Sequence, residues 1–499
     1  MRKAIEIIKK KENIFILILI FISLTGISLC INLAANDELW NFQNIYKMYN
    51  GFQIYNDANV ICTPLFFYLG NLLFNILGAN FFVFRIYNII IYLIYFFLIY
   101  KILRKLEINI KYATMSTVIF IMLGYYLIPR VMANYNSLAL VFVFLGIYLF
   151  LKNKCIINTK NIIIQSIICF LVILTKQNIG LFYAIALAIT IFFMKKNHKI
   201  SGVLQEAGIL LILSALFVLY LYTNNLLNGF INYTILGMKQ FASYNTSFSV
   251  FNIAIYISIL VINLCTSIFL IKQKKILITQ DEKNNLFILN CFSIAISLMV
   301  YPIINIGHLL FAISIAVILF IYLAKIILTK SDLKLKKINF IMNFILIILI
   351  LTDIFRNIYA LITWIKDIKS KEYFYSYNEP YFGAVVNDEL YKNIEVMTNY
   401  IKEKEAEGKD VIIFSPKAAL YMVPLKQSNG FYDLPFNGNV GKLDEEDIIK
   451  DLKNKKDTLI LITKNEKDLL WQENRKVVNF IKEKFKYVED IEDFSIYAP

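Results

Sequence analysis

The chain has 499 residues, of which 58% are hydrophobic and 15% aromatic, and its mean hydropathy is +0.61. This composition excludes an ordinary soluble protein and is typical of one that crosses a membrane many times. The net charge of +15 would suggest nucleic-acid binding in a soluble protein. However, residues 366–499 hold 21 of the 51 basic side chains and 25 of the 36 acidic ones, so the surplus lies in the apolar part. We therefore expect no nucleic-acid partner.

Eleven apolar runs are predicted to cross the membrane. Eleven spans place every lysine-rich connecting segment on one side, which the positive-inside rule identifies as the cytoplasm. The N-terminus is then cytoplasmic, and the protein is a multi-pass protein of the plasma membrane. The predicted spans are residues 13–34, 81–103, 112–128, 137–151, 161–175, 180–194, 203–222, 250–271, 285–303, 308–325 and 338–358.

An external loop, residues 36–80, follows the first span and alternates polar with aromatic residues. Such segments commonly lie along the membrane surface as amphipathic helices. Thr63-Pro64-Leu65 interrupts it, and we interpret the short apolar piece that follows, up to Gly78, as interfacial. The loop begins with two adjacent carboxylates, Asp37 and Glu38. Ionisable side chains at a membrane are costly, so these two are candidates for function.

The last 134 residues, 366–499, change character and are predicted to form an extracytoplasmic α/β domain behind a membrane domain of residues 1–365. Residues 411–414 and 458–463 are predicted strands, and 388–407, 444–456 and 471–486 are predicted helices. The domain has no GxGxxG, P-loop or HExxH motif, and the six cysteines are scattered without a CxxC pair. No cofactor, metal or redox site is predicted.

The charges on the outer face suggest a reaction. Arg85, Arg130 and Lys176 are cations beside the membrane, which suits a lipid phosphate. Asp37 and Glu38 suit removal of a proton from an acceptor as a leaving group departs. Together they indicate transfer of a group from a lipid phosphate carrier to a hydroxyl or amine. The alternatives stay open at this point: a solvated helix end for the acids, headgroup contact for the arginines, and a hairpin turn for Lys176.

The order of these features resembles the GT-C membrane glycosyltransferases, especially glycosyltransferase family 39, which includes protein O-mannosyltransferases and the lipid A aminoarabinose transferase. The resemblance starts with a basic N-terminus, one helix and an external Asp-Glu-x-Trp. It continues with Thr-Pro-Leu, a glycine and an arginine that opens the second span, and it covers most of the chain through short motifs. The matching residues are 37–40, 63–65, Gly78, Arg85, 134–136, 175–180, Tyr301-Pro302, His308 and, at the end of the external tail, Phe494-Ser495-Ile496-Tyr497.

The resemblance implies a sugar donor on polyprenyl phosphate, which is undecaprenyl phosphate in a bacterium, and inverting transfer on the outer face. It makes Asp37 the general base and Glu38 a residue that orients it or binds the acceptor. Arg85, Arg130 and Lys176 become candidates for the donor phosphate. The acceptor is an unidentified glycan, lipid or protein. The further candidates for substrate binding are Trp40, Asn134, Asn136, Gln177 and His308.

This chain departs from the family at two places where relatives carry an acid. It has Asn134 and Asn136 before the fourth span and Asn305 before the histidine of the tenth. We therefore predict transfer that is independent of a divalent metal. Two other functions compete with transfer: a transporter or flippase of lipid-linked sugars, which would use charges within the spans, and a non-catalytic membrane anchor for the acidic tail.

Overall fold

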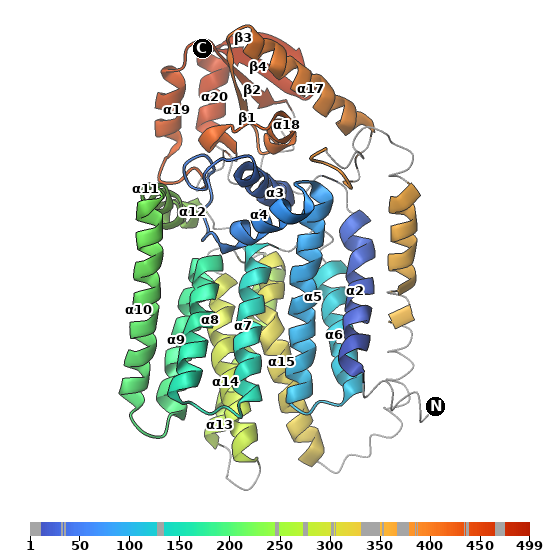
Figure 1. Ribbon diagram of the computed structural model, residues 1–499, viewed down its shortest axis with the longest axis vertical. Coiled ribbons are helices and arrows are strands. Elements are labelled where there is room, and N and C mark those ends of the chain that lie inside the picture. The colour runs from blue at the N-terminus through green and yellow to red at the C-terminus, as the bar shows by residue number, and fades with distance from the viewer. Residues whose placement is uncertain are drawn as a thin grey trace. The chain divides into compact units, whose positions relative to one another are not determined.

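A computed structural model of the chain is mostly helical, with a small mixed sheet near the C-terminus (Figure 1). The chain packs as two compact units. The first comprises Met1–Cys30, Ile86–Leu216 and Ser247–Ile365, and the second comprises Ile31–Arg85, Phe217–Thr246 and Lys366–Pro499. The structure describes residues 11–30, 33, 36–126, 134–244, 249–272, 278–300, 304, 306–330, 350–351, 354–366, 379–384, 386, 388–433, 435, 439–464 and 475–499.

The long helices agree with the predicted spans. Among the described residues, seven helices are long and apolar enough to cross a membrane, and shorter apolar helices accompany them. The described residues of the first ten predicted spans are helical except for residue 33, which lies beyond the end of the first helix, whereas most of the eleventh span lies outside the described residues. The helices are α2 (Glu12–Cys30), α5 (Phe81–Lys105), α6 (Ile110–Tyr126), α7 (Tyr135–Lys152), α8 (Thr159–Thr175), α9 (Gln177–Met194), α10 (Lys199–Thr223), α13 (Val250–Lys272), α14 (Gln280–Ser297) with the 3-10 turn η2 (Leu298–Val300), and α15 (Ile306–Lys330).

The first unit is a helical bundle in which consecutive helices pack on one another, α7 on α8, α8 on α9, and α14 on α15 (Figure 1). A pair of buried hydrogen bonds joins α7, α8 and α9. The Gln165 amide donates to the Gly146 carbonyl at 2.9 Å and accepts from the Tyr183 hydroxyl at 2.6 Å. Large apolar side chains such as Leu211 on α10 and Phe251 on α13 stay exposed. Exposed apolar surface on helices of this length suits contact with lipid, so the protein is an integral membrane protein.

The second unit assembles three stretches that are far apart in the sequence. The external loop contributes α3 (Asn36–Tyr49) and α4 (Leu65–Leu77), which begins directly after Pro64 as predicted. Residues 217–246 contribute α11 (Leu227–Phe230), the π-helix η1 (Ile231–Leu236) and α12 (Gly237–Tyr244). Hydrogen bonds join the stretches: Phe81 N–H donates to Pro380 O at 2.8 Å, and Lys442 N–H donates to Asn232 Oδ1 at 3.0 Å.

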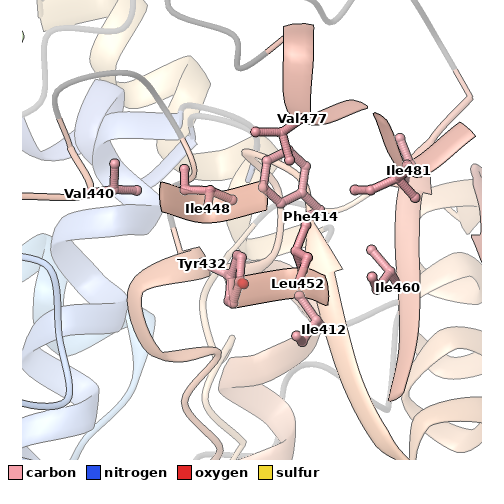
Figure 2. Close-up of a cluster of buried hydrophobic side chains, with 10 residues drawn as sticks. Ile412, Phe414, Tyr432, Val440, Ile448, Leu452, Ile460, Val477 and Ile481 are labelled. Carbon is pink, nitrogen blue, oxygen red and sulfur yellow. The ribbon is translucent and has the colours of Figure 1, made fainter. Parts of the chain in front are cut away.

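The C-terminal part of the second unit is an α/β domain with strand order β1-β2-β4-β3. The first pair is parallel, and the other two pairs are antiparallel. Helix faces and the sheet enclose a core that includes Phe414, Ile448, Ile460 and Ile481 (Figure 2). The elements are α17 (Asp388–Ala406), β1 (Asp410–Phe414), α18 (Ala419–Leu425), η3 (Gly430–Asp433), α19 (Glu445–Lys453), β2 (Thr458–Thr463), α20 (Arg475–Lys484), β3 (Lys486–Ile491) and β4 (Phe494–Ala498).

The two predicted strands and the helical segments around them are confirmed within the described residues, while β3, β4 and α18 were not predicted. The residues of β3 are almost all exposed, because this strand lies at the edge of the described sheet, where it pairs with β4. An exposed edge strand lacks the apolar alternation that marks a strand in a sequence. The sequence pattern of Lys486–Ile491 therefore does not distinguish a strand from the polar end of a helix.

The close approach of α8 and α9 makes a prediction about Gly180. A Cβ at this position would lie 2.7 Å from the backbone nitrogen of Ile173. Gly180→Ala should lower the free energy of unfolding by about 1–3 kcal/mol, because overpacking forces the backbone apart. Thermal unfolding of the detergent-purified protein measures this.

Gly208→Ala is the matched control, since a Cβ there meets nothing within 4 Å and alanine favours a helix. Equal melting temperatures for the two variants would contradict the prediction.

Candidate functional site

The first turn of α3 carries the two carboxylates that the sequence singles out, and the structure separates their environments. Asp37 is exposed, while Glu38 is only 2% exposed. Acidic residues in a first turn favour helix formation, since they complement the positive end of the helix dipole. One face of α3 then packs against α4 and α18, which buries Glu38 and leaves Asp37 at the surface of the second unit.

Glu38 is paired with Arg85, whose guanidinium is fully buried. Arg85 Nε lies 3.2 Å from Glu38 Oε1, and Nη2 lies 3.4 Å from Oε2, so the contact is two-pronged. The Phe81 ring centre lies 4.6 Å from the guanidinium carbon. Burial raises the pKa of Glu38, and the Arg85 charge and hydrogen bonds oppose that rise. The pair therefore holds a carboxylate inside the protein directly beside the exposed one.

Trp40 is buried on the same helix and meets the edge of Phe67, with ring centroids 6.0 Å apart. Neighbouring Phe42 packs against Phe74 and Phe81, with centroids 5.9 and 5.1 Å away. These aromatic contacts fix α3 on α4 and on the start of α5. Trp40 thus has a packing role in the structure, and its role in sugar binding stays a prediction.

A second group of predicted residues comes together in the first unit. Lys176 lies between α8 and α9, in an extended conformation that ends one helix and begins the next. Its ammonium lies 4.3 Å from the ring centre of Tyr135, the first residue of α7. Lys176 also interacts electrostatically with His308, near the start of α15. Three segments that the sequence placed on the outer side are therefore neighbours here.

The beginnings of α7, α9 and α15 surround this lysine. Backbone N–H groups at a helix start and the helix dipole favour an anion, and Lys176, which is 9% exposed, adds a cationic side chain. Asn134 caps α7, since its side chain accepts from Asn136 N–H at 2.9 Å and from Ser137 N–H at 3.4 Å. The arrangement suits binding of a phosphate-like group.

The structure describes two of the three remaining candidate residues. Asn136 is buried, and its side-chain oxygen has no hydrogen bond among the described residues. Gln177 is the half-buried first residue of α9. Arg130 lies outside the described residues, so its role in binding the donor phosphate stays a prediction. Within the part of the chain that the structure describes, no three His, Cys, Asp or Glu side chains are grouped so that they could hold a metal ion.

Sequence reasoning missed two partners of Lys47, a residue of the external loop 36–80. The Lys47 ammonium pairs with Asp433 and donates to the Ser428 hydroxyl at 2.8 Å, with all three groups in the second unit. These partners lie more than 380 residues further along the chain. No local pattern links residues at such a separation.

Comparison with known proteins supports the fold. The chain aligns over 97% of its length with 96% of ArnT from Cupriavidus metallidurans, in a crystal structure bound to undecaprenyl phosphate, with a TM-score of 0.52 and 11% identity. It covers 72% of the Archaeoglobus fulgidus oligosaccharyltransferase, in a complex with Zn and sulfate, with a TM-score of 0.47 and 11% identity. No family model and no curated protein sequence matches. The likeness to ArnT confirms the predicted GT-C-like fold of a helical membrane protein with a C-terminal α/β domain.

The buried Glu38–Arg85 pair makes a testable prediction. Arg85→Met leaves Glu38 buried without its cation, which should lower the free energy of unfolding by about 3–5 kcal/mol at neutral pH. Without Arg85 the pKa of folded Glu38 rises further above its ordinary value of 4.5. In the unfolded variant Glu38 therefore loses its proton at a lower pH than in the folded variant. The loss of stability in Arg85→Met should be small below pH 4.5 and grow as the pH rises. Melting temperatures across pH measure this.

The matched control is the double variant Glu38→Gln/Arg85→Met, which removes both charges and should recover much of the lost stability at neutral pH. A deficit in Arg85→Met that is the same at every pH would show that the Glu38 charge does not cause it.

Proposed function

We propose that this protein is a glycosyltransferase that moves a sugar from a polyprenyl phosphate donor to an acceptor on the extracytoplasmic side of the membrane. The observation that carries the proposal is the exposed Asp37 carboxylate, which stands on a GT-C-like fold next to the buried Glu38–Arg85 pair. In this proposal the N-terminus is cytoplasmic, and the C-terminal domain lies outside.

Asp37 acts as the general base. The acceptor hydroxyl or amine attacks the anomeric carbon from the face opposite the phosphate, and Asp37 takes the acceptor proton. The new bond forms as the sugar–phosphate bond breaks, and the bonding electrons leave with the polyprenyl phosphate. The sugar configuration is inverted. An exposed carboxylate suits this task, because an incoming acceptor can reach it.

Glu38 and Arg85 support that base. A fully buried two-pronged pair at the helix start fixes the direction of the first turn, and so the direction of the Asp37 side chain. Because the guanidinium fork faces Glu38, we assign Arg85 mainly to this support and secondarily to the donor phosphate.

Lys176 is the leading residue for the donor phosphate. A buried ammonium among three helix starts stabilises the charge that develops on a leaving phosphate. Tyr135 and His308 border the same place, and Gln177 follows directly in the chain. The ArnT structure, which contains undecaprenyl phosphate, supports a donor of this class. Arg130 is a further candidate cation.

The base assignment predicts the behaviour of Asp37→Asn, which removes the base with little change of shape. We expect a rate loss on the order of 10²–10⁴-fold. Mass spectrometry of polyprenyl-phosphate sugars and surface glycans would compare a deletion strain carrying no copy, the wild type or this variant. A lipid-linked sugar should build up, and one surface glycan should lose a residue, both in the deletion and in Asp37→Asn.

Asp57→Asn is the matched control, because its carboxylate is in the same external loop and accepts from Gln53 N–H at 2.7 Å, while the backbone carbonyl of residue 57 is unchanged by the substitution. It should behave like the wild type. An Asp37→Asn strain with wild-type glycans would refute the assignment of the base.

The phosphate assignment predicts that Lys176→Gln weakens donor binding. Charge-assisted hydrogen bonds contribute about 1.5–3 kcal/mol, so the apparent KM for the donor should rise by about tenfold or more. The probe is the lipid-linked sugar extracted from the deletion strain and added in graded amounts to membranes. Lys239→Gln, which neutralises an exposed lysine, is the control. An unchanged KM in Lys176→Gln would remove Lys176 from the phosphate site.

Transport of lipid-linked sugars is the competing function, and one observation bears on it. Glu206 lies within α10, is 3% exposed and has no ion-pair partner among the described residues. Transport paths use ionisable groups inside the membrane, which usually occur in pairs or chains. Among the described residues, Glu206 does not have the ionisable partners that such a path uses, so we favour transfer.

A further inference from the structure

Lys47 lies near the end of α3 and is buried together with its partner Asp433, while its other two partners, Asp57 and Ser428, are half-buried. Its ammonium pairs with the Asp433 carboxylate, donates to Ser428 Oγ at 2.8 Å and donates to the Asp57 carbonyl at 3.1 Å. Lys47 is 2% exposed, and Asp433 is 1% exposed. A buried lysine loses its hydrogen bonds to water, so each of its three N–H groups needs another acceptor. The three partners of Lys47 supply these acceptors.

Asp433 connects this lysine to the sheet of the C-terminal domain. Its Oδ1 accepts from Gln43 Nε2 at 2.9 Å and from Asn429 N–H at 3.1 Å. The Asn429 side chain in turn bonds the backbone of Ile413 in β1, donating to its carbonyl at 2.8 Å and accepting from its N–H at 3.2 Å. A continuous chain of buried hydrogen bonds therefore runs from a strand of the domain to two residues of α3.

These contacts fix the second half of α3, while the Glu38–Arg85 pair fixes its first turn. Lys47 is nine residues after Glu38, which is about 14 Å along a helix. Apolar contacts with α18 alone allow a helix to slide or rotate by small amounts. Buried charges with specific partners do not, because any shift leaves a charge without its hydrogen bonds. The helix is thus held near both ends, in one register.

We propose that the C-terminal domain is a positioning element of the transferase, acting through Lys47 and Asp433 to set the place of α3 and so of Asp37. This inference rests on the proposed function, and it gives the acidic tail a role other than binding the acceptor. Lys47 and Asp433 are positioning residues: they act on α3 and take no part in the bond changes.

Asp433→Asn keeps the shape of the side chain and removes its charge, and Lys47→Met removes the ammonium. Two quantities are measured on the full-length protein in detergent: hydrogen–deuterium exchange of the α3 amides, and transfer rate per folded molecule. The donor probe is the lipid-linked sugar extracted from the deletion strain. We expect faster exchange in α3 and a rate lower by about 10–100-fold, because small misplacements of a reacting group have effects of this size.

Tyr432→Phe is the matched control next to Asp433. It removes the bond from the Tyr432 hydroxyl to Asp451 at 2.6 Å, within the same domain and away from α3. It destabilises the domain without touching the link, so α3 exchange and the rate per folded molecule should stay at wild-type values. A double variant, Lys47→Met/Asp433→Asn, should lose no more rate than either single variant, since the two residues act as one unit.

The outcomes separate the two proposals. Unchanged α3 exchange in Asp433→Asn and Lys47→Met overturns the link itself, whatever the protein catalyses. Faster exchange with an unchanged rate per folded molecule overturns its role in positioning Asp37, and so does a rate loss in Tyr432→Phe as large as in Asp433→Asn. A wild-type protein without transfer overturns the proposed function, and with it the positioning role, while the exchange data still report on the link.

Discussion

Charges that leave water must find partners inside the protein, and α3 carries two of them on a largely buried helix. Glu38 meets Arg85 at one end, and Lys47 meets Asp433 near the other. Each unpaired charge would be strongly destabilising in a low-dielectric interior. The arrangement of the second unit follows from this requirement, because Arg85 must come from the start of α5 and Asp433 from the C-terminal domain, far away in the sequence.

The case for Asp37 as a functional residue depends on these two ion pairs, because they hold the helix that carries it. On a freely hydrated helix end it would be one more solvated acid. On a helix held by two buried ion pairs, it is an exposed carboxylate whose backbone position is set by those pairs. Preorganisation of this kind is what catalysis by a general base requires. In the first unit, tertiary structure acts on Lys176 in a similar way. This residue joins α8 to α9, and its burial beside Tyr135 and three helix starts makes it a candidate anion site.

Parts of this fold could be predicted because their signals are local. Long apolar runs form helices wherever they lie, since the backbone must satisfy its own hydrogen bonds in lipid. The buried strands β1 and β2 are continuous apolar runs, and Pro64 marks the start of α4. The edge strand β3 carries no such signal, because its side chains face solvent. Asn134 was expected near a substrate, and the structure shows it capping α7.

By itself, the sequence determined the class of the protein, the helices, the two central strands and the candidate residues, because hydropathy, charge distribution and short motifs act over a few residues. Only the tertiary structure decided which charges meet. It separated an exposed Asp37 from a buried Glu38 and directed Arg85 to that glutamate. It also brought Lys176 to Tyr135 and Lys47 to Asp433. These pairings depend on burial and on contacts between distant segments, and the free energy of a charge depends on both.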